Sequence, residues 1–450
     1  MKEVYIAVDF GGGSGRVIAA SIDQNKLILD ELHRFGNRQI SMGGHLYWDF
    51  LSLFEEMKTG LRIAVETGYK IISVGIDTWG VDFGLIDRNG NLLGNPVCYR
   101  DPAAVGGAER FFRENDIRAH YAEAGIQIMD INTLYRLIDM KNWAPDMLAA
   151  AHRLLFMPDL FSYFLTGKAS NEYTIASTSE LIDVRTREWN RDLIKRAGLP
   201  EHLFGEIVMP GEKRGQLTDE VKKEIGIDYD VDVIAVGSHD TASAAYSVDG
   251  TYDSDGTAFL SSGTWSLLGV VIDSPIPTEQ ARLAGFTNEG AVGGKIKFLQ
   301  NITGLWILQR LMAVWQEQGL NTTYDYLLSE AEKSDIDTII NVDDPVFAGP
   351  SQMDKTIRDY CTSHGLKVPE TQGEIVRCVL QSLAARYKRG IDEMNAMLPR
   401  PVKRLQIIGG GSRNGLLNRM TQEATGLIVE AGPVEATAIG NVLLQAKAKV

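Results

Sequence analysis

Two Gly/Ser-rich turns in matching contexts constrain the fold of this chain more than any other feature of its sequence. The first lies in AVDFGGGSGRVIAAS (7–21), and the second lies 250 positions later in TAFLSSGTWSLLGVV (257–271). In each segment an apolar run leads into a turn of Gly, Ser and Thr, and a second apolar run follows, which predicts a β-hairpin. Because the pattern occurs once in each half of the chain, we expect each hairpin to open one of two related domains.

Both turns have the composition of a phosphate-binding loop. Glycine lets the backbone approach a ligand closely, and a row of free backbone N–H groups forms a concavity suited to anions. Neither turn is a Walker A loop, because no Lys follows the glycines. The residues after the first turn, VIAAS, favour a strand rather than the helix of a Rossmann loop. Although either turn alone could be an ordinary hairpin turn, the pair predicts a nucleotide held in a cleft between two domains.

The length and charge of the chain limit the classes of protein to which it can belong. A chain of 450 residues is too long for a single core. We expect one domain over residues 1–246 and a second over 247–450, with the boundary in the Gly-, Asp- and Ser-rich segment 247–256. A net charge of −14 argues against nucleic acid and anionic membranes as partners.

Cysteine usage and hydropathy predict a cytoplasmic protein. The three cysteines form neither a disulfide framework nor a Cys-x-x-Cys metal site, which favours a reducing compartment. A bridge between Cys361 and Cys378 is the alternative. The first ten residues lack a secretory apolar region, and no run of about 18 apolar residues indicates a membrane span.

Strand and helix patterns alternate along the chain and predict an α/β protein with mixed sheets. Buried-strand patterns at 71–77 and 81–87 flank the turn TWG, as in a hairpin. The segment 231–240 is expected to be a strand that runs into a turn of small residues, 404–414 a strand that ends in a glycine turn, and 427–432 a further strand. Helical patterns occur at 51–67, 105–126, 133–143, 153–167, 304–319, 374–397, 415–425 and 435–450.

A third glycine turn, IIGGGSRN (407–414), invites comparison with a dinucleotide-binding loop. Glu430 lies about 20 residues after Gly409, where a ribose-binding acid would stand. However, Asn414 occupies the place of the third glycine, and too few residues follow Glu430 for the remaining βα units. We therefore interpret this turn as one that packs against the adenine and ribose of ATP.

GSHDTASA (237–244) contains the best candidate for a catalytic group. Asp240 follows an apolar strand pattern and stands among residues too small to crowd a substrate. A carboxylate there can accept the proton of an attacking hydroxyl in phosphoryl transfer. Asp240 could instead cap the helix that follows, and the sequence leaves both interpretations open. The other six histidines lack the spacing of metal ligands, which argues against a metal phosphohydrolase.

Other acidic and aromatic residues lie close to the first two turns. Asp9, just before the first turn, is placed to hold Mg²⁺ near phosphates through water, since Mg²⁺ keeps several of its waters. An Asx-type turn residue is the alternative. Asp77 and Asp82 flank the TWG turn and are expected to be turn or hairpin residues. Trp79 is expected either to line a sugar pocket or to belong to the core.

Nine ordered segments resemble the FGGY carbohydrate kinases over nearly the whole chain. They are VDFGGGSGR, GIDTWGVDFGLID, LFMPDLFSYFLTG, NEYT, GSHDTASA, LSSGTWSL, NITGLWILQR, IIGGGSRN and AGPVEATAIGN. GIDTWGVD and GSHDTASA resemble the members that act on L-rhamnulose. The resemblance implies two actin/hexokinase-like (ribonuclease H-like) domains with mixed sheets and ATP in the cleft between them.

The resemblance also implies an activity. It is ATP- and Mg²⁺-dependent phosphorylation of L-rhamnulose at its C1 hydroxyl, in L-rhamnose catabolism, by a monomer or weak homo-oligomer. Another ketose, such as L-fuculose or L-xylulose, is an alternative substrate. An actin-like ATPase is a more distant alternative, because a fold alone does not settle function.

Carried over position by position, the resemblance implies roles for individual residues. Asp240 would be the general base, and Asp9 the residue that holds Mg²⁺. The residues implied to bind ATP are Gly12, Gly13, Ser14, Gly15, Arg16, Thr264, Gln309 and Gly410. Those implied to bind the sugar are Gly80, His239, Asp240, Thr241 and Asn301.

Overall fold

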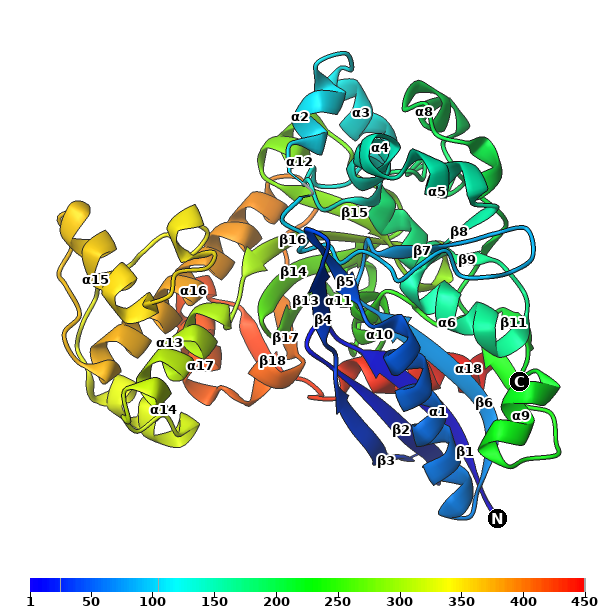
Figure 1. The fold of residues 1–450 in the computed structure, drawn as a ribbon. Helices are drawn as coiled ribbons and strands as arrows, with labels where there is room; N and C mark the ends of the chain where they lie inside the picture. The colour runs from blue at the N-terminus through cyan, green and yellow to red at the C-terminus, as the bar shows by residue number, and fades with distance from the viewer. Residues whose placement is uncertain (25, 104, 449–450) are drawn as a thin grey trace. The chain divides into compact units, whose positions relative to one another are not determined.

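The structure, a computed structural model, describes residues 1–24, 26–103 and 105–448 (Figure 1). It contains two compact units, each made of separate stretches of chain. Unit 1 comprises Met1–Ser247, Asp273–Phe298 and Ala436–Val450, and unit 2 comprises Val248–Ile272 and Leu299–Glu435. The first stretch of unit 1 ends next to the expected boundary, but the chain later returns to unit 1 twice. The division into domains at 246/247 stays a prediction.

A six-stranded mixed sheet forms the centre of unit 1. Its strand order is β11-β12-β6-β1-β2-β3. The expected first hairpin is confirmed, because β1 and β2 pair antiparallel on either side of the glycine turn. Strands β1, β6 and β12 run parallel to one another. The strands are β1 (Lys2–Phe10), β2 (Ser14–Asp23), β3 (Lys26–Gly36), β6 (Tyr69–Thr78), β11 (Lys213–Gln216) and β12 (Asp232–Ile234).

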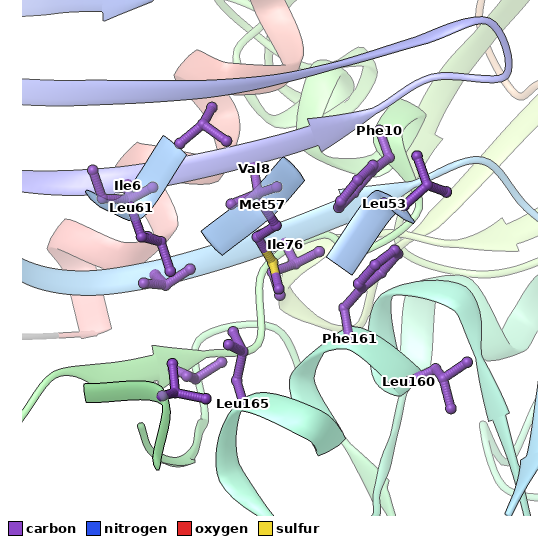
Figure 2. Close-up of a cluster of buried hydrophobic side chains, with 14 of the residues drawn as sticks. Ile6, Val8, Phe10, Leu53, Met57, Leu61, Ile76, Leu160, Phe161 and Leu165 are labelled. Atoms are coloured by element: carbon purple, nitrogen blue, oxygen red, sulfur yellow. The ribbon is translucent and has the colours of Figure 1, made fainter. Parts of the chain in front are cut away.

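Alternation along β1 sends its side chains to two different cores, as the period of two in a strand requires. Ile6, Val8 and Phe10 enter the cluster beneath helices α1 (Phe50–Glu66) and α6 (Met157–Thr166). Figure 2 shows Leu53, Met57, Leu61, Leu160, Phe161 and Leu165 of these helices gathered around that face of β1 and Ile76 of β6. The ring of Phe161 stacks on that of Phe10 with centroids 4.3 Å apart.

The opposite face of the same sheet packs against α18 (Ala436–Ala448), the last helix of the chain. Ala7 of β1 joins Ala438 and Val442 of α18 in a separate small core. Helix α18 also packs on α10 (Asp240–Tyr246) at Gly440, where an added Cβ would lie 1.8 Å from the carbonyl oxygen of Ser243. Only glycine allows the two helices to approach so closely.

The expected hairpin around TWG is wrong. Strand β6 lies inside the main sheet, whereas β7 (Phe83–Ile86) pairs antiparallel with β8 (Arg153–Phe156) in a separate two-stranded sheet. The helix expected over 153–167 is therefore shorter, because its first four residues form β8 and only α6 is helical. An apolar run cannot by itself distinguish a buried strand from a buried helix.

A second core of unit 1 lies among short helices. The helical pattern at 105–126 forms two helices, because the polar segment between them interrupts it, whereas the helix at 133–143 is confirmed as α4. The remaining elements are β4 (Gln39–Met42), β5 (His45–Trp48), α2 (Gly107–Phe112), α3 (Ile117–Ala124), α4 (Thr133–Trp143), α5 (Pro145–Ala150), β9 (Asn171–Glu172), α7 (Tyr173–Ala176), η1 (Ser177–Ser179), α8 (Arg191–Arg196), η2 (Glu201–Leu203), β10 (Ile207–Val208), α9 (Asp219–Ile225), α12 (Glu279–Leu283), β15 (Phe286–Gly290) and η3 (Val292–Gly294).

The sheet of unit 2 repeats the topology of the first. Strands β16, β14, β13, β17 and β18 are neighbours in that order. The second expected hairpin is confirmed, since β13 and β14 pair antiparallel, and β13, β17 and β18 run parallel. In both units the first strand of a hairpin is thus flanked by a later parallel strand. These strands are β13 (Thr257–Ser262), β14 (Trp265–Ile272), β16 (Ile296–Thr303), which starts in unit 1, β17 (Arg404–Ile408) and β18 (Ile428–Ala431).

The helices of unit 2 follow the expected pattern closely. The amphipathic segment at 374–397 forms α16, whose N-terminus carries a capping box between Thr371 and Glu374. The strand and glycine turn expected over 404–414 form β17 and η5, and the helix expected over 415–425 is confirmed as α17. The elements are α11 (Tyr252–Asp255), α13 (Trp306–Glu317), α14 (Tyr324–Lys333), η4 (Pro345–Phe347), α15 (Met353–Ser363), α16 (Gln372–Asn395), η5 (Gly410–Arg413) and α17 (Gly415–Thr425).

Two further observations concern cysteines and hydropathy. Cys98, Cys361 and Cys378 are all buried free thiols, so the alternative of a bridge between the last two does not hold. Within residues 1–24, 26–103 and 105–448, none of the helices combines the length and apolar character needed to span a membrane.

Two leucines of α1 provide a direct test of the core in Figure 2. Leu53 is 2% exposed and Leu51 is 68% exposed. We expect Leu53→Ala to lower the free energy of unfolding of unit 1 by about 2–5 kcal/mol, because it leaves a cavity. Leu51→Ala, the matched control, should change it by less than about 0.5 kcal/mol. Urea unfolding monitored by circular dichroism would measure both, and equal midpoints for the two variants would contradict the packing.

Candidate active site

The first glycine turn is fixed from one side and open on the other. The backbone N–H of Gly11 donates to Ser14 O at 2.8 Å, and Asn37 donates its backbone N–H to Gly13 O at 3.1 Å. The side-chain amide of Asn37 also donates to Gly11 O at 2.9 Å. A Cβ added at Gly13 would meet nothing within 4 Å. The turn is therefore preorganised while its tip leaves space for a ligand, as a phosphate loop requires.

Gly15 has a packing reason to be glycine. A Cβ at this position would lie 2.3 Å from the ring of Phe35, which is itself buried. The glycine at 15 thus lets β2 pass beside the Phe35 ring on β3. Its implied contact with ATP, like that of Ser14 next to it, stays a prediction.

Asp9 and Arg16 face each other across the hairpin. The two residues are register partners in β1 and β2, and Arg16 Nη2 donates to Asp9 Oδ2 at 2.5 Å. The alternative of an Asx-type turn residue is wrong, because Asp9 lies within β1 rather than in the turn. Its role toward Mg²⁺ stays a prediction.

Asp77 is the neighbour of Asp9 on β6, and the expectation of a turn residue is wrong there too. Asp77 is completely buried inside the strand, in register with Asp9. Burial and the charges of Asp9 and Asp240 raise the pKa of Asp77 well above its ordinary value, although the amide of Asn441 donates to Oδ2 at 2.6 Å. Its other oxygen has no hydrogen-bond partner among the residues that the structure describes. Three carboxylates thus converge at one end of the sheet.

The ends of β6 and β12 bring Gly80 and His239 together. Thr78 donates its backbone N–H to Ser238 O at 2.9 Å, so the two chain segments continue side by side. A Cβ at Gly80 would lie 3.5 Å from His239 Nε2 and 3.4 Å from the side chain of Thr178. Of the residues implied to bind sugar, Gly80, His239, Asp240 and Thr241 therefore form one cluster in unit 1.

Asp240 is the first residue of α10, and the residue in the capping position is His239. Asp240 Oδ1 accepts from the backbone N–H of Thr241 at 2.5 Å and from its hydroxyl at 3.0 Å. The side chain of Asp240 is 32% exposed, whereas its neighbours His239 and Thr241 are buried. Asp240 is thus oriented by its own helix and still accessible to a ligand.

A buried carboxylate that sequence reasoning did not single out supports this turn. Glu172 Oε2 accepts from the backbone N–H of Ser238 at 3.2 Å and from the hydroxyl of Thr174 at 2.6 Å. Thr174 Oγ1 accepts in turn from the backbone N–H of His239 at 3.2 Å. Burial raises the pKa of Glu172 to about 7, against the lowering effect of its bonds to Thr174. The segment NEYT, conspicuous in the sequence, was the available signal.

Asp82 is not a turn residue but the centre of a buried polar network, which corrects the second expectation about the TWG segment. Its Oδ2 accepts from the indole N–H groups of Trp48 at 2.5 Å and Trp79 at 2.8 Å, and its Oδ1 accepts from Arg136. The rings of Trp48 and Trp79 lie 4.2 Å apart. Trp79 therefore belongs to the core, one of the two roles expected for it, and fixes the segment that leads into Gly80.

In unit 2 the structure brings the second and third glycine turns together. Thr264, between β13 and β14, donates its hydroxyl to Gln309 Oε1 of α13 at 3.2 Å. Gly411 packs so tightly on Ser262, at the end of β13, that a Cβ would lie 2.0 Å from Ser262 Oγ, whereas Gly410 is exposed with open space around it. Thr264, Gln309 and Gly410 thus lie around the end of one hairpin.

Two other residues of unit 2 complete the comparison with the expected site. Asn301, implied to bind sugar, lies half-buried on β16. Glu430 forms an ion pair with Arg404, Oε2 to Nη2 at 2.6 Å, on the neighbouring strand. This ion pair accounts for the position of the Glu430 carboxylate without a role in binding ribose. It agrees with the prediction that the third glycine turn is not a dinucleotide-binding loop.

No group of three or more His, Cys, Asp or Glu side chains among the residues that the structure describes is arranged to hold a metal ion by itself.

Comparisons with known proteins define the class to which this fold and site belong. The N-terminal domain model of the FGGY family of carbohydrate kinases matches residues 4–247, and the C-terminal domain model matches residues 258–449. The chain therefore belongs to the FGGY family of carbohydrate kinases, which confirms the expected family and the two-domain α/β fold.

Similar individual proteins include curated sequences and solved structures. The chain is 46% identical over 447 residues to a rhamnulokinase from Bacteroides thetaiotaomicron, covering 99% of this chain and 91% of that protein. It is 38% identical to a rhamnulokinase from Oceanobacillus iheyensis, covering 99% and 93%. A xylulose kinase from Lactobacillus acidophilus superposes with a TM-score of 0.81 at 15% identity, covering 99% and 89%. A Plasmodium falciparum glycerol kinase solved with ADP gives 0.82 at 15% identity, covering 100% and 90%.

The glycine turn of η5 yields a stability prediction. We expect Gly411→Ala to lower the melting temperature measurably, because the new methyl group would overlap Ser262 and shift the turn. Gly410→Ala, one position away, has space for its methyl group and a backbone that needs no positive φ. It should therefore change the free energy of unfolding by less than about 0.5 kcal/mol. Thermal unfolding without ligand would compare them, and equal melting temperatures would contradict the close approach.

Proposed function

We propose that this FGGY kinase transfers the γ-phosphoryl group of ATP to the C1 hydroxyl of L-rhamnulose, giving L-rhamnulose 1-phosphate and ADP in L-rhamnose catabolism. The observation that carries the proposal is the accessible carboxylate of Asp240, clustered with His239 and Gly80 in a chain 46% identical to a rhamnulokinase. The same fold in kinases for other substrates supports the reaction class but not the choice of sugar.

Asp240 acts as the general base of the proposed reaction. With Oδ1 held by Thr241, the second carboxylate oxygen takes the proton from the C1 hydroxyl. The hydroxyl oxygen forms a bond to the γ-phosphorus as the bond from that phosphorus to the β–γ bridging oxygen breaks, and its electron pair leaves with ADP. General-base assistance of this kind typically contributes about 10²–10⁴ in rate.

The glycine turns are proposed to bind ATP. The open tip at Gly13 and the free space at Gly410 fit a ligand that approaches the backbone closely. In unit 1, residues Gly12 to Arg16 would contact phosphate. In unit 2, Thr264 would approach the phosphates, Gln309 would contact ATP, and Gly410 would lie beside the adenosine. Backbone N–H groups at such turns stabilise negative charge without having to reorganise during the reaction.

Asp9 is proposed to hold Mg²⁺ through water. When bound, Mg²⁺ neutralises charge on the phosphoryl oxygens. The chain's own residues fit that role, since Asp9 lies near the end of β1 in register with the buried Asp77 and pairs with Arg16. The hydrogen bond from Arg16 fixes the Asp9 carboxylate near the end of β1.

The sugar is proposed to contact Gly80, His239, Asp240, Thr241 and Asn301. The lack of a side chain at Gly80 leaves room beside His239 Nε2, and His239 offers a ring nitrogen to a hydroxyl. A cytoplasmic location, a monomer or weak homo-oligomer, and independence from nucleic acid and membranes complete the proposal. The cytoplasm supplies the ATP that the proposed reaction consumes, and it keeps cysteines reduced, in agreement with the three free thiols.

The role of Asp240 is tested by Asp240→Asn. We expect kcat to fall by about 10²-fold or more, because the amide cannot accept the proton, while ATP binding survives. Asp219→Asn removes a carboxylate that is 98% exposed on α9 and should leave kcat unchanged. Steady-state kinetics and calorimetric ATP titration would separate the two effects. Turnover of Asp240→Asn within a few-fold of the unmodified enzyme would remove Asp240 from the proposed role.

The choice of sugar is tested by ADP release with Mg²⁺ and ATP against L-rhamnulose, L-fuculose, L-xylulose, D-xylulose and glycerol, with a sugar-free control. We expect the highest kcat/KM for L-rhamnulose, although a single methyl-for-hydrogen difference in a pocket is worth only about 10–200-fold. Preference for another ketose would keep the kinase reaction and change the substrate. Equal ADP release in every reaction, including the sugar-free one, would contradict sugar phosphorylation and favour an ATPase.

A further inference from the structure

Three buried ionisable side chains meet at one edge of the His239 ring. Lys297 Nζ lies 3.0 Å from His239 Nδ1, and Glu289 Oε2 lies 3.1 Å from the same nitrogen. Glu289 Oε2 is also 3.1 Å from Lys297 Nζ, which closes a triangle. Lys297 is 0% exposed, Glu289 6% and His239 8%. A fully buried lysine is rare unless its charge is paired, so this arrangement needs an explanation.

The two charged partners require different states of the histidine. An ammonium group only donates hydrogen bonds, so Lys297 requires a lone pair on Nδ1, whereas the carboxylate of Glu289 would accept from an Nδ1–H group. Glu289 Oε2 forms an ion pair with Lys297 and has no hydrogen-bond partner among the described residues. The hydrogen bond at His239 Nδ1 is the one with Lys297, and a hydrogen on Nδ1 would point an N–H dipole at that ammonium group 3.0 Å away. An imidazolium ring would place two cations against one carboxylate. The triangle therefore favours a neutral ring with its hydrogen on Nε2.

The charge of Glu289 is stable in this arrangement. Burial by itself would raise the pKa of Glu289, but the charge of Lys297 opposes burial and lowers the pKa below its ordinary value. Glu289 therefore stays ionised near neutral pH and offers its charge to Lys297 Nζ at 3.1 Å.

The opposite edge of the ring faces the proposed sugar site. His239 Nε2 lies 3.6 Å from Asp240 Oδ1 and 3.5 Å from the position that a Cβ of Gly80 would occupy. A hydrogen on Nε2 lies close to these groups, where it can donate to a sugar oxygen beside the base. A bare Nε2 could only accept there and would compete with Asp240 for the proton of the hydroxyl group.

We infer that Lys297 and Glu289 are positioning residues that hold His239 as its Nε2–H tautomer, so that His239 donates a hydrogen bond to the sugar while Asp240 alone accepts the proton. The consequence for catalysis rests on the function proposed above. Both residues come from the segment of β15, η3 and β16 that joins unit 1 well after His239 in the chain, and neither belongs to the helix that carries Asp240.

The tautomer can be measured without relying on activity. The ¹⁵N chemical shifts of a histidine ring distinguish the Nε2–H form, the Nδ1–H form and the imidazolium. In protein labelled at histidine, comparison with His239→Gln identifies the His239 signals among the seven histidines. We expect the Nε2–H form in the unmodified protein and, in Lys297→Met, a shift to a ring that donates from Nδ1 to Glu289. An Nδ1–H ring in the unmodified protein, or an unchanged ring in Lys297→Met, would overturn the inference.

The consequence for catalysis is tested by kinetics with a matched control. Loss of a hydrogen bond to the sugar typically lowers kcat/KM by about 10–100-fold. We therefore expect kcat/KM for L-rhamnulose to fall by that factor in Lys297→Met, while the affinity for ATP stays unchanged. Lys295→Met changes a lysine two residues away that pairs with Asp273, and it should behave like the unmodified enzyme. Unchanged kcat/KM in Lys297→Met would overturn the positioning role.

A double variant separates positioning from folding. Lys297→Met alone leaves Glu289 buried without its cation and is expected to lower the melting temperature, since an unpaired buried charge is destabilising. Glu289→Gln/Lys297→Met removes both charges and should recover stability but not kcat/KM or the tautomer. Recovery of activity together with stability would show a purely structural pair. If the unmodified enzyme phosphorylates no sugar, the proposed function fails, whereas the histidine spectrum still tests the tautomer.

Discussion

The site depends on a buried carboxylate held in the middle of a β-sheet. Asp77 lies on the parallel strand next to Asp9, and its charge would be costly there without a partner. Helix α18 supplies that partner, because Asn441 donates to Asp77 at 2.6 Å. One turn further along, Gln445 donates to Ile6 O at 2.9 Å and accepts from Ser73. The last helix of the chain therefore fixes the two strands that carry Asp9 and lead to Gly80.

A repeated topology explains why glycine turns mark the candidate ATP-binding residues. In each unit a hairpin begins the sheet, and a later strand joins it in parallel, β6 beside β1 and β17 beside β13. The turn of the hairpin then lies at the same edge as the end of the parallel strand. In unit 2 this geometry brings Gly411 against Ser262, and in unit 1 it brings Asp77 beside Asp9. The two halves thus position different chemistry with the same arrangement of strands.

Buried polar groups behind the site give the accessible ones their orientation. Glu172 accepts from the backbone of the turn before His239, while Asp82 fixes Trp79 just before Gly80. Glu289 and Lys297 meet His239 from a third direction. Such a shell restricts the rotamers of the residues that would touch substrate, and preorganisation of this kind lets a site stabilise developing charge at no cost in reorganisation.

The sequence by itself determined the elements whose signals are local. Both hairpins, helices such as 415–425, and the motif containing Asp240 follow from periodicity and turn residues over a few positions, and the ordered motifs identified the family. Only the tertiary structure decided which strands pair. In the structure β7 pairs with β8 rather than with β6, and Asp77 and Asp82, which were expected to be turn residues, are buried. It also revealed Glu289 and Lys297, because single charged residues leave no pattern, and their effect on His239 exists only once folding excludes water around all three.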